Sequence, residues 1–235
     1  MPSGSLILAP PQSKNVITRV ALIADGQQSR VVPGTFTLGA ELAVAAEGTA
    51  EDVTATITGA QASIVQVGQV LAFESPAGRY YRATVRTKYE ATGTSLALSA
   101  TETIPTGSVA KFPAEFRIRQ SADLAKSTST TTFSSFDHDV SDQSINETTA
   151  TLTFNGGFNW YDPGYATCEY AQTQSQKIYV ERELPSPDGN VFNSGPIEWG
   201  IAVISGDATP APNGGNVSAN VTFAISGSVS KIEPA

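Results

Sequence analysis

Cysteine and histidine are almost absent from this sequence, whose 235 residues include one of each, Cys168 and His138. A single cysteine excludes an internal disulfide, and a lone histidine with no second histidine or cysteine nearby lacks the usual zinc-ligand spacing. No apolar run approaches the roughly 18 residues that span a bilayer, and the first five residues lack the positive charge that begins a secretory signal. We therefore expect a protein that is made and used in soluble form, without a disulfide framework or a metal centre.

Basic residues are also scarce, and their distribution is uneven. The chain carries 14 Lys and Arg against 22 Asp and Glu, a formal net charge of −8. Residues 1–115 hold eight basic and nine acidic side chains, whereas residues 116–235 hold six and thirteen. Tight binding to nucleic acid requires a basic surface that neutralises phosphates. The charge balance therefore argues against a stable nucleic-acid complex, although it allows a polyanion to pass without binding.

Local catalytic signatures are missing as well. The sequence contains no Gly-x-Ser-x-Gly elbow, no glycine-rich phosphate loop followed by lysine and no dinucleotide fingerprint. In Asp137-His138-Asp139 the histidine of an extended chain cannot share a face with both carboxylates, because neighbouring residues point to opposite sides. Cys168 falls on the apolar side of an expected helix, which is typical of a small core residue. We predict no enzyme activity and no cofactor.

The first half of the chain is a series of short apolar and β-branched segments. After an N-terminal arm, a first strand is expected over residues 16–24, ending at a turn. Further strands are expected between glycine and proline turn signals, at 53–58, 69–74, 79–89, 94–99 and 108–112. This spacing is typical of a small sandwich or barrel, so we predict a small all-β domain over residues 36–115. Within it, Arg82, Arg86 and Lys88 share one strand face, which indicates either an ordinary solvated surface or a strip that binds a polyanion.

The second half predicts a strand, a short helix and further strands. Residues 149–154 alternate threonine with apolar residues, the pattern of a half-buried strand. Asp162-Pro163 is a typical helix start, an N-cap acceptor followed by proline at the first helical position, and the helix should lie near 163–174. Alternation returns in three later segments, of which we expect the last two to be an antiparallel pair: 177–183, 197–203 and 217–225.

A polar stretch precedes this strand and helix. Between Gln120 and Glu147 the composition changes to Ser, Thr, Asp and Asn, and residues 134–146 are predicted to be a long loop. Loops of that length inside a compact domain usually have a function. The acidic residues of this region lack the spacing of a calcium loop. The candidate functional residues in the loop are Phe136, Asp137, His138, Asp139 and Asp142.

Several of these segments follow one another in a recognisable order: the Thr/Asp-rich residues 131–139, the strand 149–154, Gly156-Gly157-Phe158, Asp162-Pro163-Gly164 at the helix start, the strand 178–182, and a last pair ending in residues 221–227. Together they resemble the major tail tube proteins of long-tailed (siphovirus-type) bacteriophages. The resemblance covers about residues 116–235, together with the strand at 16–24. It rests on the order of elements, since no single residue in it is diagnostic.

The resemblance implies a mainly β fold, a tail-tube-type β-sandwich or barrel with one short flanking helix, assembled as hexameric rings that stack into a conduit for DNA ejection. Residues 1–35 would supply the arm and first strand of the tube domain, and 116–235 the rest of it. The 36–115 domain would be an insertion on the outer surface. The loop at 134–146 would contact the next ring.

The partners that the resemblance implies are further copies of the chain and the tape-measure, tail-terminator and tail-tip proteins. Genomic DNA would be present only in transit, and no membrane would be involved. The protein would reside in the virion tail after assembly in the host bacterial cytoplasm. Two alternatives stay open: a related tail terminator or neck protein, and a surface- or carbohydrate-binding β-sandwich that uses exposed Tyr80, Tyr81 or Tyr89.

Overall fold

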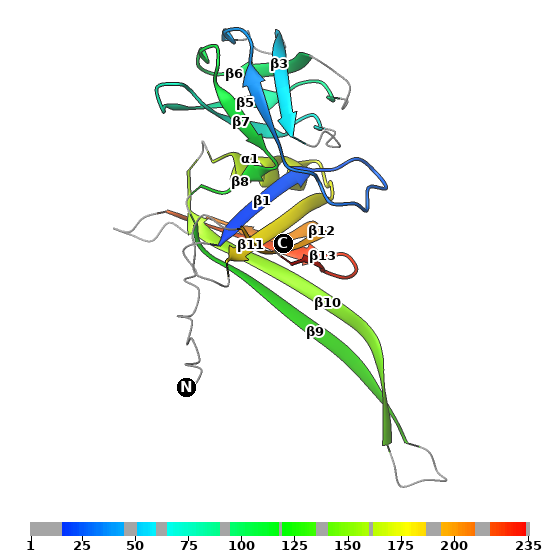
Figure 1. Ribbon diagram of the computed structural model, residues 1–235. Coiled ribbons are helices and arrows are strands. Elements are labelled where there is room, and N and C mark those ends of the chain that lie inside the picture. The colour runs from blue at the N-terminus through cyan, green and yellow to red at the C-terminus, as the bar shows by residue number, and fades with distance from the viewer. Residues whose placement is uncertain are drawn as a thin grey trace, which may run out of the picture.

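The computed structural model describes residues 16–44, 51–59, 65–89, 95–117, 119–134, 141–159, 162–186, 194–209 and 217–233, with the backbone alone at 51–59, 119, 130–134, 141–148 and 194. Over this part of the chain the fold is mainly β, with one helix and two sheets, which confirms the predicted fold class (Figure 1). The same residues include no helix with the length and apolarity that a membrane crossing needs.

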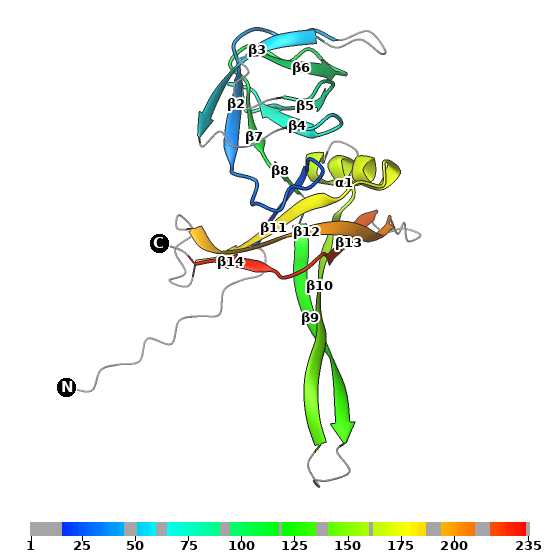
Figure 2. The ribbon, with the colours of Figure 1, turned by 90° about the vertical axis from the view of Figure 1, so that its right-hand side faces the viewer.

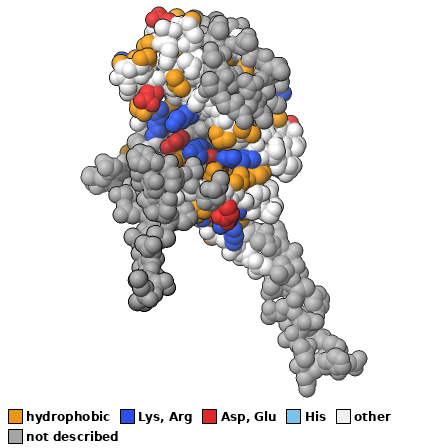
Figure 3. Space-filling model, viewed as in Figure 1, with side chains coloured by type: hydrophobic (Ala, Val, Ile, Leu, Met, Phe, Trp, Pro, Cys, Tyr) orange, Lys and Arg blue, Asp and Glu red, His pale blue; other side chains and the backbone are white. Residues whose placement is uncertain are grey.

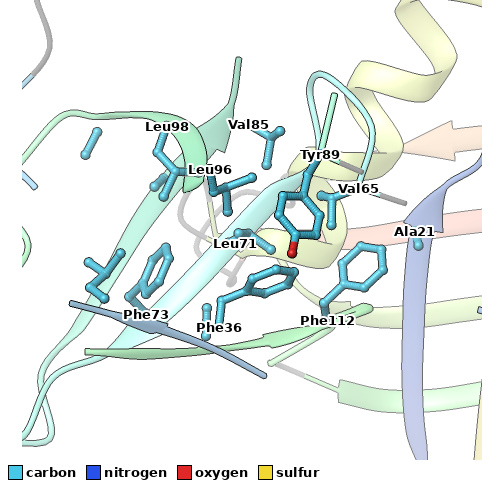
Figure 4. Close-up of a cluster of buried hydrophobic side chains, with 14 of the residues drawn as sticks. Ala21, Phe36, Val65, Leu71, Phe73, Val85, Tyr89, Leu96, Leu98 and Phe112 are labelled. Carbon is cyan, nitrogen blue, oxygen red and sulfur yellow. The ribbon is translucent and has the colours of Figure 1, made fainter. Parts of the chain in front are cut away.

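A closed barrel of six short strands forms the upper unit in Figure 1. Neighbouring strands are antiparallel throughout, and closure removes the free edges that an open sheet would leave. Phenylalanines fill the interior, where Phe36 meets Tyr89 and Phe112 edge-on at ring separations of 5.7 and 6.2 Å (Figure 4). In barrel order the strands are β2 (Gly34–Leu38), β3 (Glu51–Gly59), β6 (Ser95–Ala100), β5 (Tyr80–Val85), β4 (Val70–Glu74) and β7 (Val109–Phe112).

The strand predicted over 79–89 is too long, because β5 ends at Val85. After this point the chain turns inward, and Tyr89 pairs its backbone with Val65, at 2.9 and 3.3 Å, as an isolated bridge. The Tyr89 side chain is consequently buried in the barrel core, with 4% of its surface exposed. Of the three tyrosines proposed for a sugar-binding surface, this one is therefore excluded.

The second sheet bends over on itself into a sandwich. One core joins residues from distant strands of the sheet, including Val20, Val180, Leu152 and Phe223. Its order is β8 (Ala114–Glu115), β1 (Ile17–Leu22), β11 (Ile178–Pro185), β12 (Ser194–Ala208), β13 (Ser218–Ile225), β10 (Ser141–Gly157) and β9 (Arg119–Ser134), with β14 (Ser230–Ile232) beside β12. The predicted antiparallel pair is confirmed as β12 and β13, although β12 uses residues 202–208 for it.

Helix α1 (Pro163–Thr173) closes one side of the sandwich and confirms the predicted helix. The Asp162 carboxylate caps it, accepting a hydrogen bond from the Tyr165 N–H at 3.0 Å and another from the Arg117 N–H at 2.8 Å. Cys168 points into the sandwich core with 1% of its surface exposed, as expected for a small core residue. The local capping signal was sufficient here because it depends on adjacent residues.

A fully buried glutamine joins the barrel to the sandwich. The Gln69 Oε1 accepts a hydrogen bond from the Leu22 N–H of β1 at 3.0 Å, and its Nε2 donates to the Thr167 Oγ1 of α1 at 3.2 Å. The barrel core also continues into the sandwich through Ala21 and Tyr179. Barrel, helix and sheet are therefore packed as one body in a single chain.

Candidate functional site

The longest feature of the molecule is the hairpin of β9 and β10, which leaves the sandwich as an arm (Figures 1 and 2). Strand β10 pairs with β13 only along Ala150–Gly157, whereas it pairs with β9 along Ser141–Gly156. The outer part of the arm is consequently a ribbon of two strands. A two-stranded ribbon is marginally stable at best in water, so this part gains stability from any surface that covers it.

This hairpin corrects the predicted loop at 134–146. Strand β9 continues to Ser134 and β10 already begins at Ser141, where Asp142 pairs with Phe133. A strand is recognised from alternating apolar and polar residues, which arise when one face of the strand packs on a second layer. The two-stranded ribbon has no second layer, so its serines and threonines show no alternation and gave no strand signal. Of the ring-stacking candidates, Asp142 lies on β10. The others fall outside the described residues: Phe136, Asp137, His138 and Asp139.

The outer edge of β9 is the second feature of the arm. Within the described chain, β9 pairs only with β10, so its other side is an edge of the sheet. Near the body this edge is covered, since the Arg182 Nη1 donates to the Ala122 carbonyl at 2.8 Å and Lys126 lies 3.8 Å from Glu198. Backbone groups alternate in direction along an antiparallel strand, so Thr128 also directs its N–H and C=O to this edge.

A buried cluster of charge lies on β1 and β11, away from the arm. Glu181 is fully buried and accepts hydrogen bonds from Arg19 at 2.7 Å, from Arg30 at 3.3 and 3.4 Å, and from the Tyr179 hydroxyl. Burial and the adjacent carboxylate raise the pKa of Tyr179, so its hydroxyl stays protonated as the donor. The Glu181 oxygens already accept these bonds, so the cluster holds Arg30 against β11 and leaves Glu181 unlike a general base, which needs an accessible oxygen.

The predicted basic face is only partly a strand face. Arg82 lies on β5, whereas Arg86 and Lys88 follow the end of that strand. The Arg86 Nε donates to the Ser99 hydroxyl at 2.9 Å, which occupies one of its donors within the barrel surface. Binding of a polyanion to these three residues stays a prediction.

A cleft at the junction of barrel and sandwich was not predicted. Two cavities of about 400 and 280 Å³ adjoin there, and Tyr80 and Arg117 line both. The Arg117 guanidinium lies over the Tyr80 ring, 3.8 Å from its centroid. Lys and Arg side chains gather at this level of the molecule (Figure 3). The two residues lie far apart in sequence and belong to different units, so no local motif could have revealed the pair.

The remaining titratable groups of the core do not form a reactive site. Burial, with Asp162 and Asp207 nearby, raises the pKa of the Cys168 thiol well above its ordinary value, which keeps it protonated. The Tyr165 hydroxyl donates to Asp207 at 3.3 Å, and burial raises the pKa of Tyr165 to about 12. Burial also raises the pKa of Asp207, whose Oδ1 has no hydrogen-bond partner. Among the described residues, no group of three or more His, Cys, Asp or Glu is placed to hold a metal ion.

No protein-family model matches this sequence, and a search of curated proteins gave no match. Two solved structures are similar over part of the chain. One is the tail of an empty GTA particle with C6 symmetry, at 14% identity and a TM-score of 0.38, covering 49% of this chain and 82% of that chain. The other is the virion of a native gene transfer agent (GTA) particle, at 14% identity and a TM-score of 0.39, covering 50% and 86%.

Proposed function

We propose that this protein is a structural subunit of a bacteriophage-type tail tube, built of stacked hexameric rings that conduct DNA. The observation that supports this most is the β9–β10 arm with its open edge. A long unpaired strand edge is an aggregation liability in a monomer, and closure of a ring removes it from every copy at once. The arm in turn gains the packing surface that it lacks in a single chain.

Ring closure requires a contact between two different surfaces of neighbouring copies. The β9 edge beyond Lys126 supplies one such surface, because Ser127, Thr128 and Ser129 are exposed and small enough for a second backbone to approach. The other end of the sheet is unlike it, since β8 has only two residues, Ala114 and Glu115. This asymmetry favours a head-to-tail contact over a symmetric pair.

The distribution of charge fits a conduit. The half of the chain that contains the arm and most of the sandwich carries the acidic excess. A wall of like charge repels the DNA phosphates, so the genome slides without binding. The barrel would lie on the tube exterior, and the tape-measure, tail-terminator and tail-tip proteins would contact the tube. The subunit would belong to the virion and would have no catalytic role.

Electron microscopy of the purified full-length chain tests the proposal. We expect six-fold rings or tubes about 100 Å across, by order of magnitude for a ring of such domains. Thr128→Pro removes an N–H that faces the open edge and leaves the bonds between β9 and β10 in place, so it should abolish assembly without unfolding the monomer. Thr128→Ala keeps that N–H and serves as the matched control, which should assemble normally.

Two results would contradict this function. One is a wild-type chain that stays monomeric at high concentration with no rings or tubes in the images. The other is normal assembly of Thr128→Pro with an unchanged circular dichroism spectrum, which would show that the β9 edge is not the contact between copies.

A further inference from the structure

The cleft at the junction of barrel and sandwich consists of two adjoining cavities that share one aromatic residue. Tyr80 is the first residue of β5 and has 53% of its surface exposed. The larger cavity, about 400 Å³, has the size of a small-molecule site, and the smaller one continues past the same ring. A ligand longer than one ring could therefore lie across Tyr80.

The polar lining of the larger cavity is balanced in charge. Two acceptors, Glu74 and Glu115, face two donors, Lys111 and Arg117. The Arg117 guanidinium carbon lies 3.8 Å from the Tyr80 ring centroid and so occupies one face of the ring, and a ligand that stacks on Tyr80 would use the other face. The smaller cavity adds a mixed set of the same kind: Arg82, Thr101, Glu102 and Asn159.

This lining selects among ligand classes. A polyanion would meet three carboxylates, Glu74, Glu102 and Glu115, beside three cations, Arg82, Lys111 and Arg117, on a protein of net charge −8, so the lining does not favour a negative ligand. A purely apolar ligand would desolvate charged side chains without giving them hydrogen bonds. A neutral polyhydroxylated ring avoids both penalties. It carries no negative charge, and each of its hydroxyls can donate a hydrogen bond to a carboxylate or accept one from Lys or Arg. Its C–H face also packs on an exposed aromatic ring.

We propose that this cleft binds a neutral saccharide of two or more units, which stacks on Tyr80 and bonds to the surrounding charged side chains. The apolar floor at Ala72 and Val109, between β4 and β7, would lie beneath the sugar. The site uses β4, β5, β7, β8 and the segment at Arg117 and makes no use of the β9 edge. A failure of either proposal therefore leaves the other standing.

The test is an array of neutral and anionic di- to tetrasaccharides probed with the full-length chain, followed by calorimetric titration of the best ligand. Tyr80→Ala should weaken binding about tenfold or more, whereas Tyr80→Phe should stay within about threefold if ring stacking carries the affinity. Val44→Ala removes an equally exposed apolar side chain, 53% exposed and outside the cleft, and should change nothing. Thermal melting of each variant shows that the fold is retained.

Three outcomes would overturn the proposal. No neutral saccharide on the array binds the wild-type chain. A neutral saccharide binds, but Tyr80→Ala retains the wild-type affinity. Binding is confined to sulfated or phosphorylated saccharides and is lost at high salt, which would identify an anion site instead.

Discussion

The strongest test of the architecture is Gly68→Ala, at the contact between the barrel and helix α1. Gly68 has a φ of +88°, and a Cβ built there would lie 2.4 Å from the ring of Tyr170. The left-handed backbone costs about 1–2 kcal/mol for a residue with a Cβ. Overpacking against the ring adds about 1–3 kcal/mol. The substitution should therefore lower the free energy of unfolding by about 2–5 kcal/mol, a large share of a typical total of about 5–15.

Gly78→Ala is the matched control, because it separates the two effects. Gly78 also has a positive φ, +74°, but a Cβ there would meet no atom within 4 Å. This variant should lose only the backbone part, about 1–2 kcal/mol. The difference between the two variants measures the contact between barrel and helix.

Urea denaturation followed by circular dichroism and tryptophan fluorescence gives both values. In a double-mutant cycle, Tyr170→Ala should remove the steric part of the Gly68→Ala effect, with a coupling of about 1–3 kcal/mol. Equal losses for Gly68→Ala and Gly78→Ala, or a coupling near zero, would refute the docking of Tyr170 on the barrel.

Four further predictions concern polar groups in and near the core. Glu181→Gln should lower the free energy of unfolding by about 2 kcal/mol in urea denaturation, because the half-buried Arg19 and Arg30 lose their buried carboxylate while Arg19 keeps Glu183 at 2.7 Å. Glu102→Gln, in an exposed ion pair, should change it by less than about 1 kcal/mol. Cys168 should react with a thiol reagent only at the rate at which the chain opens, since it is buried and protonated; labelling kinetics against urea concentration measure this, and rapid labelling of the native protein would contradict it. Asp207→Asn should raise the melting temperature at neutral pH and have no such effect in acid. A raised carboxyl pKa means that the folded state holds the proton more tightly than the unfolded state. The wild type therefore loses stability as the pH rises from the ordinary pKa of aspartate through the raised value. By the same reasoning the raised pKa of Tyr165 predicts a loss of stability between pH 10.0 and about 12, which Tyr165→Phe should reduce in a pH series of melts, while the raised pKa of Tyr179 keeps a remaining loss.

Elements with a local signal could be predicted from the sequence. Asp162-Pro163 predicts where α1 begins, because capping depends on side chains next to the first turn. Strand β13 follows the expected alternation, with Ala219, Val221 and Phe223 buried and the residues between them partly exposed. In both elements the signal, an N-cap for α1 and alternating apolar residues for β13, lies within the segment itself and does not depend on distant residues.

Features that depend on distant partners could not be predicted. The alternation of β11 gave no sign that Glu181 would be buried. Residues 178–181 are buried in succession, and Arg19 reaches the Glu181 carboxylate from 162 residues away. Gln69 and Thr167 meet across 98 residues in the same way. A pattern of polar and apolar residues cannot show that a polar side chain has found its partner inside the core.

The connection of the barrel to the sheet would let one subunit serve the two proposed surfaces, the saccharide cleft and the β9 edge. The barrel strands begin at Gly34, after β1, and end at Phe112, before β8. Strands β1 and β8 pair directly, so the chain enters and leaves the barrel at one end of the sheet. The open edge of β9 is at the other end of the strand order.

A barrel inserted between β1 and β8 leaves the proposed assembly edge on β9 untouched, so Tyr80→Ala should form rings as the wild type does. Thr128→Pro should in turn bind saccharide as a monomer with wild-type affinity. A change in both properties by either variant would show that cleft and edge are coupled, and would place the barrel in the contact between subunits.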